Sequence, residues 1–218
     1  MIDFNRLKRK EFGDSLSFKT KIIRPQLRYI TEDVSSCIND MAYHNQFITC
    51  FRIYIYLTDL DTDKDIEVGA VAGCFITPEE FRGRCNFLDI FDCVGGDLMD
   101  LAEEITDESY EIRKDICDDT DLIAYVGDIY IKRKYRGYGI GSFVLQELHE
   151  ILLYYSREFI TKIFLQPQPR VVNRNRKIQN ISDKNKAKSR IEKELMDFYL
   201  KNGFKKIEGT KYLVKKGF

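Results

Sequence analysis

At 218 residues the chain is long enough for one well-cored domain, and we expect residues 1–218 to form a single domain. Hydrophobic residues make up 44% of the sequence and aromatic residues 13%, so a packed globular protein is expected and a disordered chain is excluded. The 35 basic and 35 acidic residues give a formal net charge of zero, which argues against a protein whose main role is to coat nucleic acid or an anionic membrane.

Cysteine usage and the lack of long apolar runs predict a reduced, cytoplasmic protein. The six cysteines form no C-x-x-C pair, the first residues carry no apolar run typical of a signal peptide, and no stretch reaches the length of a membrane span. With two histidines and no cysteine cluster, no metal site is predicted. His149 falls on the polar side of a predicted helix, so we expect it at the surface.

The first part of the chain predicts a helix followed by a hairpin. The helix is expected near residues 30–41, where apolar residues recur at helical spacing. Residues 46–57 and 66–76 are rich in β-branched and aromatic residues and predict a β-hairpin. Alternating aspartates in the connecting loop suggest calcium, but Lys64 and Ala70 replace the glycine and the glutamate that an EF-hand needs. A charged turn explains this loop better.

An acidic insertion from about 81 to 121 follows the hairpin. Residues 86–121 hold thirteen Asp and Glu residues against two basic ones, and residues 97–109 among them predict a helix. A strand is expected over 122–131, a helix from about 139 to 155 with apolar residues at helical spacing, and a further strand over 162–166.

A basic segment from about 169 to 190 comes next. It has eight basic residues against one acidic residue and little apolar periodicity, which predicts a long mobile loop. Ser189 and Glu192 form a capping-box pattern, so a helix is expected to begin there. The apolar stripe of this helix comprises Ile191, Leu195 and Phe198.

The chain closes with a helix end and a strand. Asn202 and Gly203 can supply the left-handed residue that ends the helix, and a final strand is expected around 211–216. Strands that alternate with helices behind a hairpin predict an α/β or α+β fold.

The stretch "YRGYGIGSF" places Gly137, Gly139 and Gly141 between a predicted strand and a predicted helix. Such a turn directs several backbone N–H groups one way at the positive end of the helix dipole, and Arg136 adds a cation beside them. Side chains at the glycines would hold a phosphate away from these N–H groups. The spacing fits neither the P-loop, G-x-x-x-x-G-K-[ST], nor the Rossmann turn, G-x-G-x-x-G. The remaining pattern is R-x-x-G-x-G.

The segment "IYIKRKYRGYGIGSFVLQEL" resembles the acetyl-coenzyme A binding segment of the GCN5-related N-acetyltransferase (GNAT) superfamily, whose signature is [Q/R]-x-x-G-x-[G/A]. The tail "DFYLKNGFKKI" is similar to the second hallmark of that family, a helix ending in Tyr-x-x-x-Gly-Phe. Together these segments cover roughly residues 122–207. The resemblance implies a mixed, mostly antiparallel sheet flanked by helices and splayed between its fourth and fifth strands.

The resemblance also implies a set of residues for acetyl-coenzyme A. The turn would hold the pyrophosphate, and the end of the fourth strand would hold the pantetheine arm through backbone atoms. The implied cofactor-binding residues are Ile129, Tyr130, Ile131, Arg136, Gly137, Tyr138, Gly139, Ile140, Gly141 and Ser142.

Two residues are implied as catalytic. Tyr199 occupies the place of the tyrosine that protonates the leaving sulfur in many members, and Asp128 is the nearest ionisable candidate for the base, although its strand parity is opposite to that of Ile129 and Ile131. Packing against the cofactor without proton transfer is the alternative for Tyr199. Glu192 and Leu195 stand where many members carry Asn and Ala, which departs from the family pattern.

The implied function is transfer of an acetyl group from acetyl-coenzyme A to a primary amine of a small molecule or a protein. If the acidic insertion lines the acceptor cleft, a cationic amine is favoured. Two alternatives stay open: a non-catalytic acyl-coenzyme A sensor, and acetylation of an RNA-borne amine through the basic segment. The zero net charge disfavours nucleic acid, no membrane partner is expected, and a homodimer is compatible with the sequence.

Overall fold

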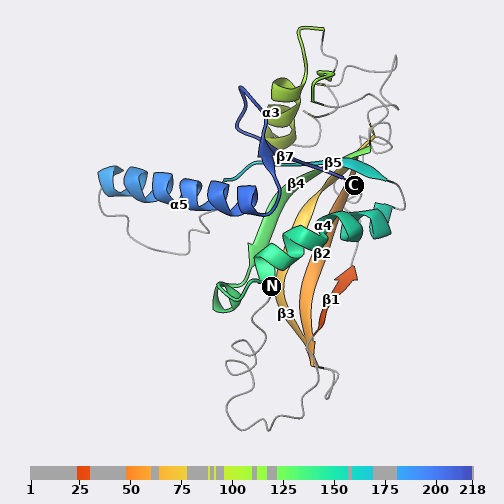
Figure 1. The fold of residues 1–218 in the computed structure, drawn as a ribbon, viewed down its shortest axis with the longest axis vertical. Coiled ribbons are helices and arrows are strands. Elements are labelled where there is room, and N and C mark those ends of the chain that lie inside the picture. The colour runs from red at the N-terminus through yellow and green to blue at the C-terminus, as the bar shows by residue number, and fades with distance from the viewer. Residues whose placement is uncertain are drawn as a thin grey trace.

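A computed structural model describes residues 24–29, 48–59, 64–77, 88, 91, 96–109, 112–116, 122–156, 159–168 and 181–217. Within them a seven-stranded sheet has the order β1-β2-β3-β4-β5-β7-β6 (Figure 1). The strands are β1 (Arg24–Tyr29), β2 (Ile48–Asp59), β3 (Lys64–Ile76), β4 (Leu122–Ile131), β5 (Ile160–Leu165), β6 (Lys205–Lys206) and β7 (Leu213–Lys216). The helices are α3 (Gly96–Ile105), α4 (Ile140–Ser156), α5 (Ile181–Lys201) and the short 3-10 helix η3 (Arg133–Tyr135).

The sheet is mixed and mostly antiparallel. Among the described strands, only β4 and β5 pair in parallel, and α4 forms the crossover between them, while the other neighbouring strands run antiparallel. A parallel pair needs such a crossover because its two strands start at the same edge of the sheet. The predicted fold class is therefore confirmed.

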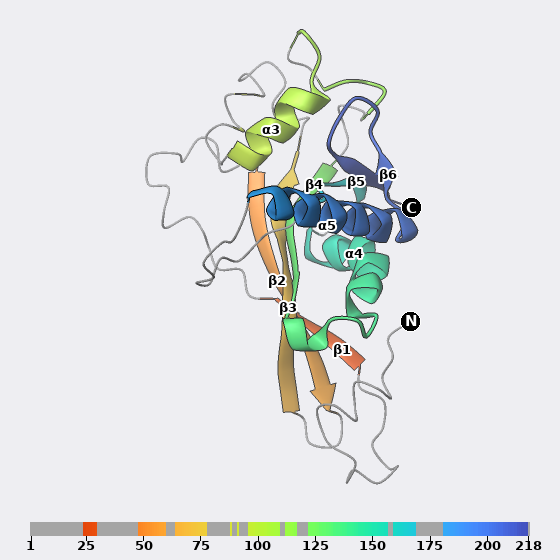
Figure 2. The same cartoon turned by 90° about the vertical axis from the view of Figure 1, so that its left-hand side faces the viewer.

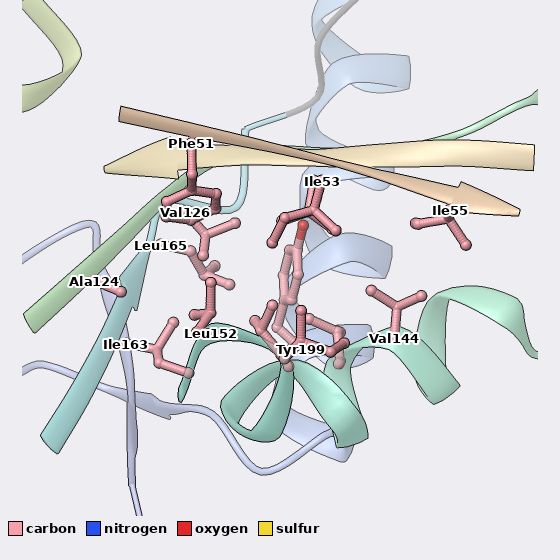
Figure 3. Packing of buried hydrophobic residues seen from close by; sticks show 14 of the residues in the cluster. Phe51, Ile53, Ile55, Ala124, Val126, Val144, Leu152, Ile163, Leu165 and Tyr199 are labelled. Carbon is pink, nitrogen blue, oxygen red and sulfur yellow. The ribbon is translucent and has the colours of Figure 1, made fainter. Parts of the chain in front are cut away.

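Helices cover both faces of this sheet. One core cluster joins the inward side chains of β2, β4 and β5 to α4 and to Tyr199 of α5, as Figure 3 shows. A second cluster lies on the opposite face under α3, because it contains Ile123 and Tyr125, which alternate along β4 with Ala124 and Val126 of the first cluster. Figure 2 shows α4 beside the strands and α3 at the upper end of β2, and Figure 1 shows α5 extending outward from the sheet near β4.

The predicted helix over 139–155 and the hairpin are confirmed. The described apolar side chains of this helical stripe, from Ile140 to Leu152, are buried, and β2 pairs with β3 as expected. His149 contradicts its prediction, because it is 2% exposed and its Nε2 lies 2.8 Å from the carbonyl oxygen of Ile160. The start of β5 packs over this side of α4, and a hydrogen bond there allows a polar ring to be buried.

The helix start predicted at Ser189 is wrong, since α5 begins at Ile181. The second half of the predicted basic loop is therefore helical, and residues 169–180 lie outside the described residues. The S-x-x-E spacing also fits the middle of a helix, where an i,i+4 ion pair joins Arg190 and Glu194 at 2.9 Å. Ile191, expected on the apolar stripe, is 42% exposed.

Other predictions have mixed outcomes. The helix predicted over 97–109 is observed as α3 but already ends at Ile105, and Gly203 ends α5 with a φ of 90° as predicted. Strand β1 was not predicted. The helix expected near 30–41 and two of the loop aspartates, Asp61 and Asp63, lie outside the described residues. Among the described helices none is long and apolar enough to cross a membrane.

Candidate functional site

A β-bulge interrupts β4 in its middle. Gly73 pairs with Val126 and the preceding Ala72 pairs with Asp128, so Gly127 is the extra residue on β4. Such a bulge bends the strand and re-aims the side chains that follow it. The single glycine within "LIAYVGDIYI" is the sequence signal that could have predicted it.

The bulge reverses the alternation of the side chains along β4. Val126 before it and Ile129 and Ile131 after it all face the same core cluster, although their parities differ. Asp128 and Tyr130 consequently take the other face, and Tyr130 is 41% exposed. Ile129 and Ile131 pack against the first core cluster, in agreement with the parity that they share.

Strands β4 and β5 separate beyond the bulge. Their parallel register ends at the pair Val126 and Leu165, whereas β4 continues to Ile131 (Figure 1). An extended ligand can lie beside such a strand end and use its backbone hydrogen-bonding groups. The splay that the resemblance implies is therefore present.

The turn after β4 owes its shape to glycine. Gly137 and Gly139 have φ values of 80° and 84°, a region that other L-residues adopt at a steric cost. A Cβ at Gly137 would meet no atom within 4 Å, so the space in front of the turn is open there. Gly139 accepts a hydrogen bond from the N–H of Phe143 at 3.0 Å and thereby begins α4.

Gly141 has a different role, since it allows α4 and α5 to approach closely. A Cβ at Gly141 would lie 3.2 Å from Cζ of Phe198 on α5, which is tighter than ordinary contact. The N–H groups of Ile140, Gly141 and Ser142 are among the first of α4 and have no acceptor inside the helix. The helix dipole adds positive potential at this end.

Basic residues fix the two sides of the turn. Nε of Arg136 donates a hydrogen bond to the carbonyl oxygen of Ile131 at 2.8 Å, and the guanidinium carbon lies 5.8 Å from the ring centroid of Tyr130. The backbone N–H of Lys132 donates to Val68, and its Nζ pairs with Glu67 at 2.8 Å. The cation of Arg136 is thus held beside the open turn while remaining exposed to solvent.

Some of the implied cofactor-binding residues can contact a ligand only through their backbone atoms. Those of Tyr138 and Ile140 are 8% and 1% exposed and belong to the core cluster, so only their backbone atoms can serve a ligand at the turn. Gly137 is exposed, and Ser142 is half-buried. The implied residues from Arg136 to Ser142 form one continuous turn and helix start, next to the end of β4.

Tyr199 enters the core cluster from α5, and its hydroxyl points toward Ile53 on β2 (Figure 3). The residue is 8% exposed, and its ring packs edge-on against Phe198 and Phe204 at centroid distances of 5.4 Å and 5.9 Å. Burial, and secondarily the negative charge of Asp128, raises the pKa of Tyr199 to about 12. The phenol is therefore protonated at neutral pH, and the two implied catalytic residues interact electrostatically.

Sequence reasoning missed two parts of this site. Phe198 was expected only as an apolar stripe residue, yet it packs on Gly141 and beside Tyr199. Gly73 was not singled out, and a side chain there would collide with the backbone oxygen of Tyr125 beside the bulge. A glycine within the apolar run "AVAGCFI" is the signal that indicates such a close approach.

The site fits the phosphates of coenzyme A. The left-handed glycines, the open space at Gly137, the N–H groups that begin α4 and the held guanidinium of Arg136 form a cradle for an anion. Among the described residues no group of three or more His, Cys, Asp or Glu side chains could hold a metal ion.

No protein-family model matches the chain, and no curated protein matches it. Among solved structures, the KacTA–DNA complex is 11% identical with a TM-score of 0.41, over 88% of this chain and 93% of that one. AtaTR bound with AcCoA is 12% identical with a TM-score of 0.39, and a mutant of KacT is 10% identical with a TM-score of 0.41. These cover 88% of this chain and 93% and 95% of the other chains.

Because these identities and TM-scores are low, the fold assignment rests on the strand order, the bulge in β4 and the glycine turn. The fold is the mixed sheet, splayed between its fourth and fifth strands, that the resemblance to the GCN5-related N-acetyltransferases implies.

Proposed function

We propose that the protein is an acetyl-coenzyme A dependent N-acetyltransferase of the GCN5-related type, acting on a primary amine in a ternary complex. The observation that carries this proposal is the combination of the splay between β4 and β5 with the glycine turn that directly follows β4. The free end of β4 suits a long, neutral, extended arm of a ligand, and the glycine turn that follows it suits a pyrophosphate. Coenzyme A has both groups.

Each part of the site has a task in this proposal. The N–H groups of Ile140, Gly141 and Ser142, with Arg136, would hold the pyrophosphate, and the backbone of Ile129–Ile131 would hold the pantetheine arm. When bound, acetyl-coenzyme A supplies a thioester that an amine can attack. A backbone N–H of β4 would stabilise the negative charge that develops on the acyl oxygen.

Tyr199 and Asp128 would move the protons. The phenol of Tyr199 is protonated at neutral pH because burial raises its pKa to about 12, so it would donate its proton to the leaving sulfur. The amine must lose a proton before it attacks. Asp128, on the face of β4 opposite to Ile129 and close enough to influence Tyr199, would accept this proton directly or through water.

The acceptor is proposed to be a small-molecule or protein amine, and acidic residues favour a cationic one. Helix α3 carries an acidic surface and lies on the face of the sheet opposite to α4. Part of its charge is already compensated, because Nζ of Lys211 lies 2.7 Å from Asp100 and 3.8 Å from Glu104. The proposal includes this acidic surface of α3 as one border of the acceptor cleft.

The test has two stages on the same protein. Acetyl-coenzyme A binding is measured by calorimetry, with dephospho-coenzyme A and adenosine diphosphate as partial ligands. Product is then followed by mass spectrometry of the acetylated amine, because the six cysteines of the chain would react with a thiol reagent. The amines tested are a polyamine, an aminoglycoside, a lysine peptide and an aminoacyl-RNA.

Binding followed by acetylation of one class of amine is the expected result. Binding with no product from any amine would support the sensor instead. Product from the aminoacyl-RNA alone, with turnover that falls steeply as salt rises, would assign the RNA-borne amine. Absence of acetyl-coenzyme A binding would overturn the proposal.

A further inference from the structure

Two cysteines face one another across the hairpin formed by β2 and β3. Cys50 of β2 and Cys74 of β3 are direct partners in the antiparallel register, and their sulfur atoms lie 2.9 Å apart. Both are free thiols in this structure. The sequence contained no signal for this pair, because the two residues lie 24 positions apart in the chain.

The strand register brings the backbones of these residues to a distance that suits a disulfide. Direct partners in an antiparallel pair have Cα atoms about 4.5–5.5 Å apart, and disulfides span Cα distances of about 4.4–6.8 Å. The rest of the hairpin holds both backbones in place, since pairing continues on both sides, from Ile48–Ile76 to Arg52–Ala72. The two sulfur atoms can therefore bond without movement of either strand.

The two thiols differ in access and in acidity. Cys74 is 7% exposed, whereas Cys50 is half-buried, between the buried Ile48 and the exposed Arg52 on the same strand face. The hydrogen bond between the thiols lowers the pKa of Cys50, and the same interaction together with burial raises the pKa of Cys74. Cys50 is thus the more accessible and more acidic of the two thiols, and Cys74 is the buried partner behind it.

We propose that Cys50 and Cys74 form a peroxide-reactive dithiol, in which Cys50 is the attacking cysteine and Cys74 the resolving one. The Cys50 thiolate attacks one oxygen of hydrogen peroxide, the O–O bond breaks, and the released hydroxide takes a proton to leave as water, which yields a sulfenic acid on Cys50. The Cys74 sulfur then attacks the Cys50 sulfur, the S–O bond breaks, and a second water leaves. Peroxide is reduced by two electrons and the thiol pair is oxidised to a disulfide between β2 and β3. This inference is independent of the proposed acetyltransferase activity.

The test maps the cysteines of the full chain after oxidation. The reduced protein is treated with hydrogen peroxide, the remaining thiols are blocked with N-ethylmaleimide, and the protein is digested without reductant. Chymotrypsin suits this digest, because cleavage after Phe47 and Phe51 separates Cys50 from Cys37. A cross-linked peptide pair containing Cys50 and Cys74, lighter by two hydrogen atoms and lost on treatment with dithiothreitol, is the expected result.

Single variants assign the roles of the two thiols. In Cys74→Ser the oxidation is expected to stop at a sulfenic acid on Cys50, which dimedone traps. In Cys50→Ser, Cys74 is expected to stay reduced under the same treatment. Oxidation of the wild-type chain in guanidinium is the matched control, and preferential pairing of Cys50 with Cys74 should disappear there because it depends on the folded hairpin.

Two results would overturn the inference. One is a folded protein in which Cys50 and Cys74 are both fully alkylated after peroxide while other cysteines are oxidised. The other is a Cys50 that is found only in disulfides with cysteines other than Cys74. Circular dichroism of each serine variant shows whether it retains the fold of the wild-type chain, and the wild-type digest decides the question whatever the variants do.

Discussion

Tyr199 combines a buried ring with an electrostatic interaction with Asp128 on β4, and its ring and its hydroxyl lead to separable predictions. Its ring contributes to the core cluster with Phe198 and Phe204. Its hydroxyl is the group proposed to protonate the leaving sulfur. Replacement by phenylalanine keeps the ring and removes only the hydroxyl.

We expect Tyr199→Phe to lower kcat about 10²-fold, because general acids contribute at least this much, while the Kd for acetyl-coenzyme A stays within about twofold. Steady-state kinetics and calorimetry measure the two quantities. Tyr212→Phe is the matched control, since its buried phenol donates to the carbonyl oxygen of Asp97 at 3.3 Å on the α3 side of the sheet. An unchanged kcat in Tyr199→Phe would show that the hydroxyl is not the general acid and that Tyr199 serves only in packing.

The raised pKa of Tyr199 also predicts how stability depends on pH. A tyrosine ionises near pH 10 in the unfolded chain, but in the folded protein Tyr199 stays protonated up to about pH 12. The folded state therefore binds the proton more tightly, and this contribution to stability is complete below pH 10 and is lost between pH 10 and pH 12. Over that window the wild-type chain should lose up to about 2–3 kcal/mol relative to Tyr199→Phe.

Denaturant unfolding of both proteins at several pH values measures this difference, because other alkaline ionisations are common to the two chains. Parallel pH profiles for wild-type protein and variant would contradict the predicted shift. Absorbance of the phenolate in the folded protein gives an independent reading of the same titration.

At the scale of elements, the contact between α4 and α5 at Gly141 sets the width of the site beside the turn. A Cβ at Gly141 would press on Phe198 at 3.2 Å, and the β-branched valine would add further atoms there. Overpacking of this kind costs about 1–3 kcal/mol. The helix interface therefore explains why the second glycine of the R-x-x-G-x-G pattern cannot carry a side chain here.

We expect Gly141→Val to lower the free energy of unfolding by about 1–3 kcal/mol and to weaken acetyl-coenzyme A binding. Phe198→Leu added to it should restore part of the lost stability, because the shorter side chain withdraws from the new valine. A double-mutant cycle by denaturant unfolding measures this coupling. Additive effects of the two substitutions would show that the strain arises elsewhere.

At the scale of the whole molecule, α3 is attached to the sheet both by surface ion pairs and by buried apolar side chains. The acidic helix α3 covers one face of the sheet. Lys211, just before β7, forms ion pairs with Asp100 and Glu104 of this helix. These ion pairs are partly exposed, so each stabilises the fold by at most about 1 kcal/mol. The apolar side of α3, with Leu101 and Ile105 fully buried, carries most of the attachment.

If this acidic face borders the acceptor cleft, combined neutralisation of Asp97, Asp100, Glu103 and Glu104 should raise KM for a cationic amine severalfold with little change in kcat. The physical reason is loss of the negative potential that attracts the substrate. Neutralisation of Glu147 and Glu150 on the exposed side of α4 is the control. An unchanged KM in the α3 variant would exclude that face from acceptor binding.

The variant Leu101→Ala measures how much apolar burial stabilises the packing of α3 on the sheet. Removal of this fully buried side chain leaves a cavity under α3, and we expect the free energy of unfolding to fall by about 2–5 kcal/mol. Lys211→Met, which removes the ion pairs at the surface, should cost less than about 1 kcal/mol. Chemical denaturation ranks the two variants, and an equal or larger effect of Lys211→Met would contradict the dominance of apolar burial.

The amino-acid sequence was sufficient to predict the local features that depend on spacing along the chain. Alternation and β-branched residues predicted the hairpin and β4, helical spacing predicted α4, and the glycine pattern predicted the turn between β4 and α4. It failed where a short pattern has two local solutions, as for Ser189, or where burial comes from a distant element, as for His149 under the start of β5. Strand β1 lacked a pattern that could be told apart from its surroundings.

Contacts between residues that are far apart in the chain could be seen only in the folded protein. The bulge at Gly127 depends on its register with Gly73, the close approach at Gly141 depends on Phe198, and the thiol pair depends on the alignment of Cys50 with Cys74. Each of these contacts is set by packing between elements that are far apart in the chain. Local propensity constrains the conformation of a segment, but the partner of a side chain follows from the register and depth at which whole elements pack.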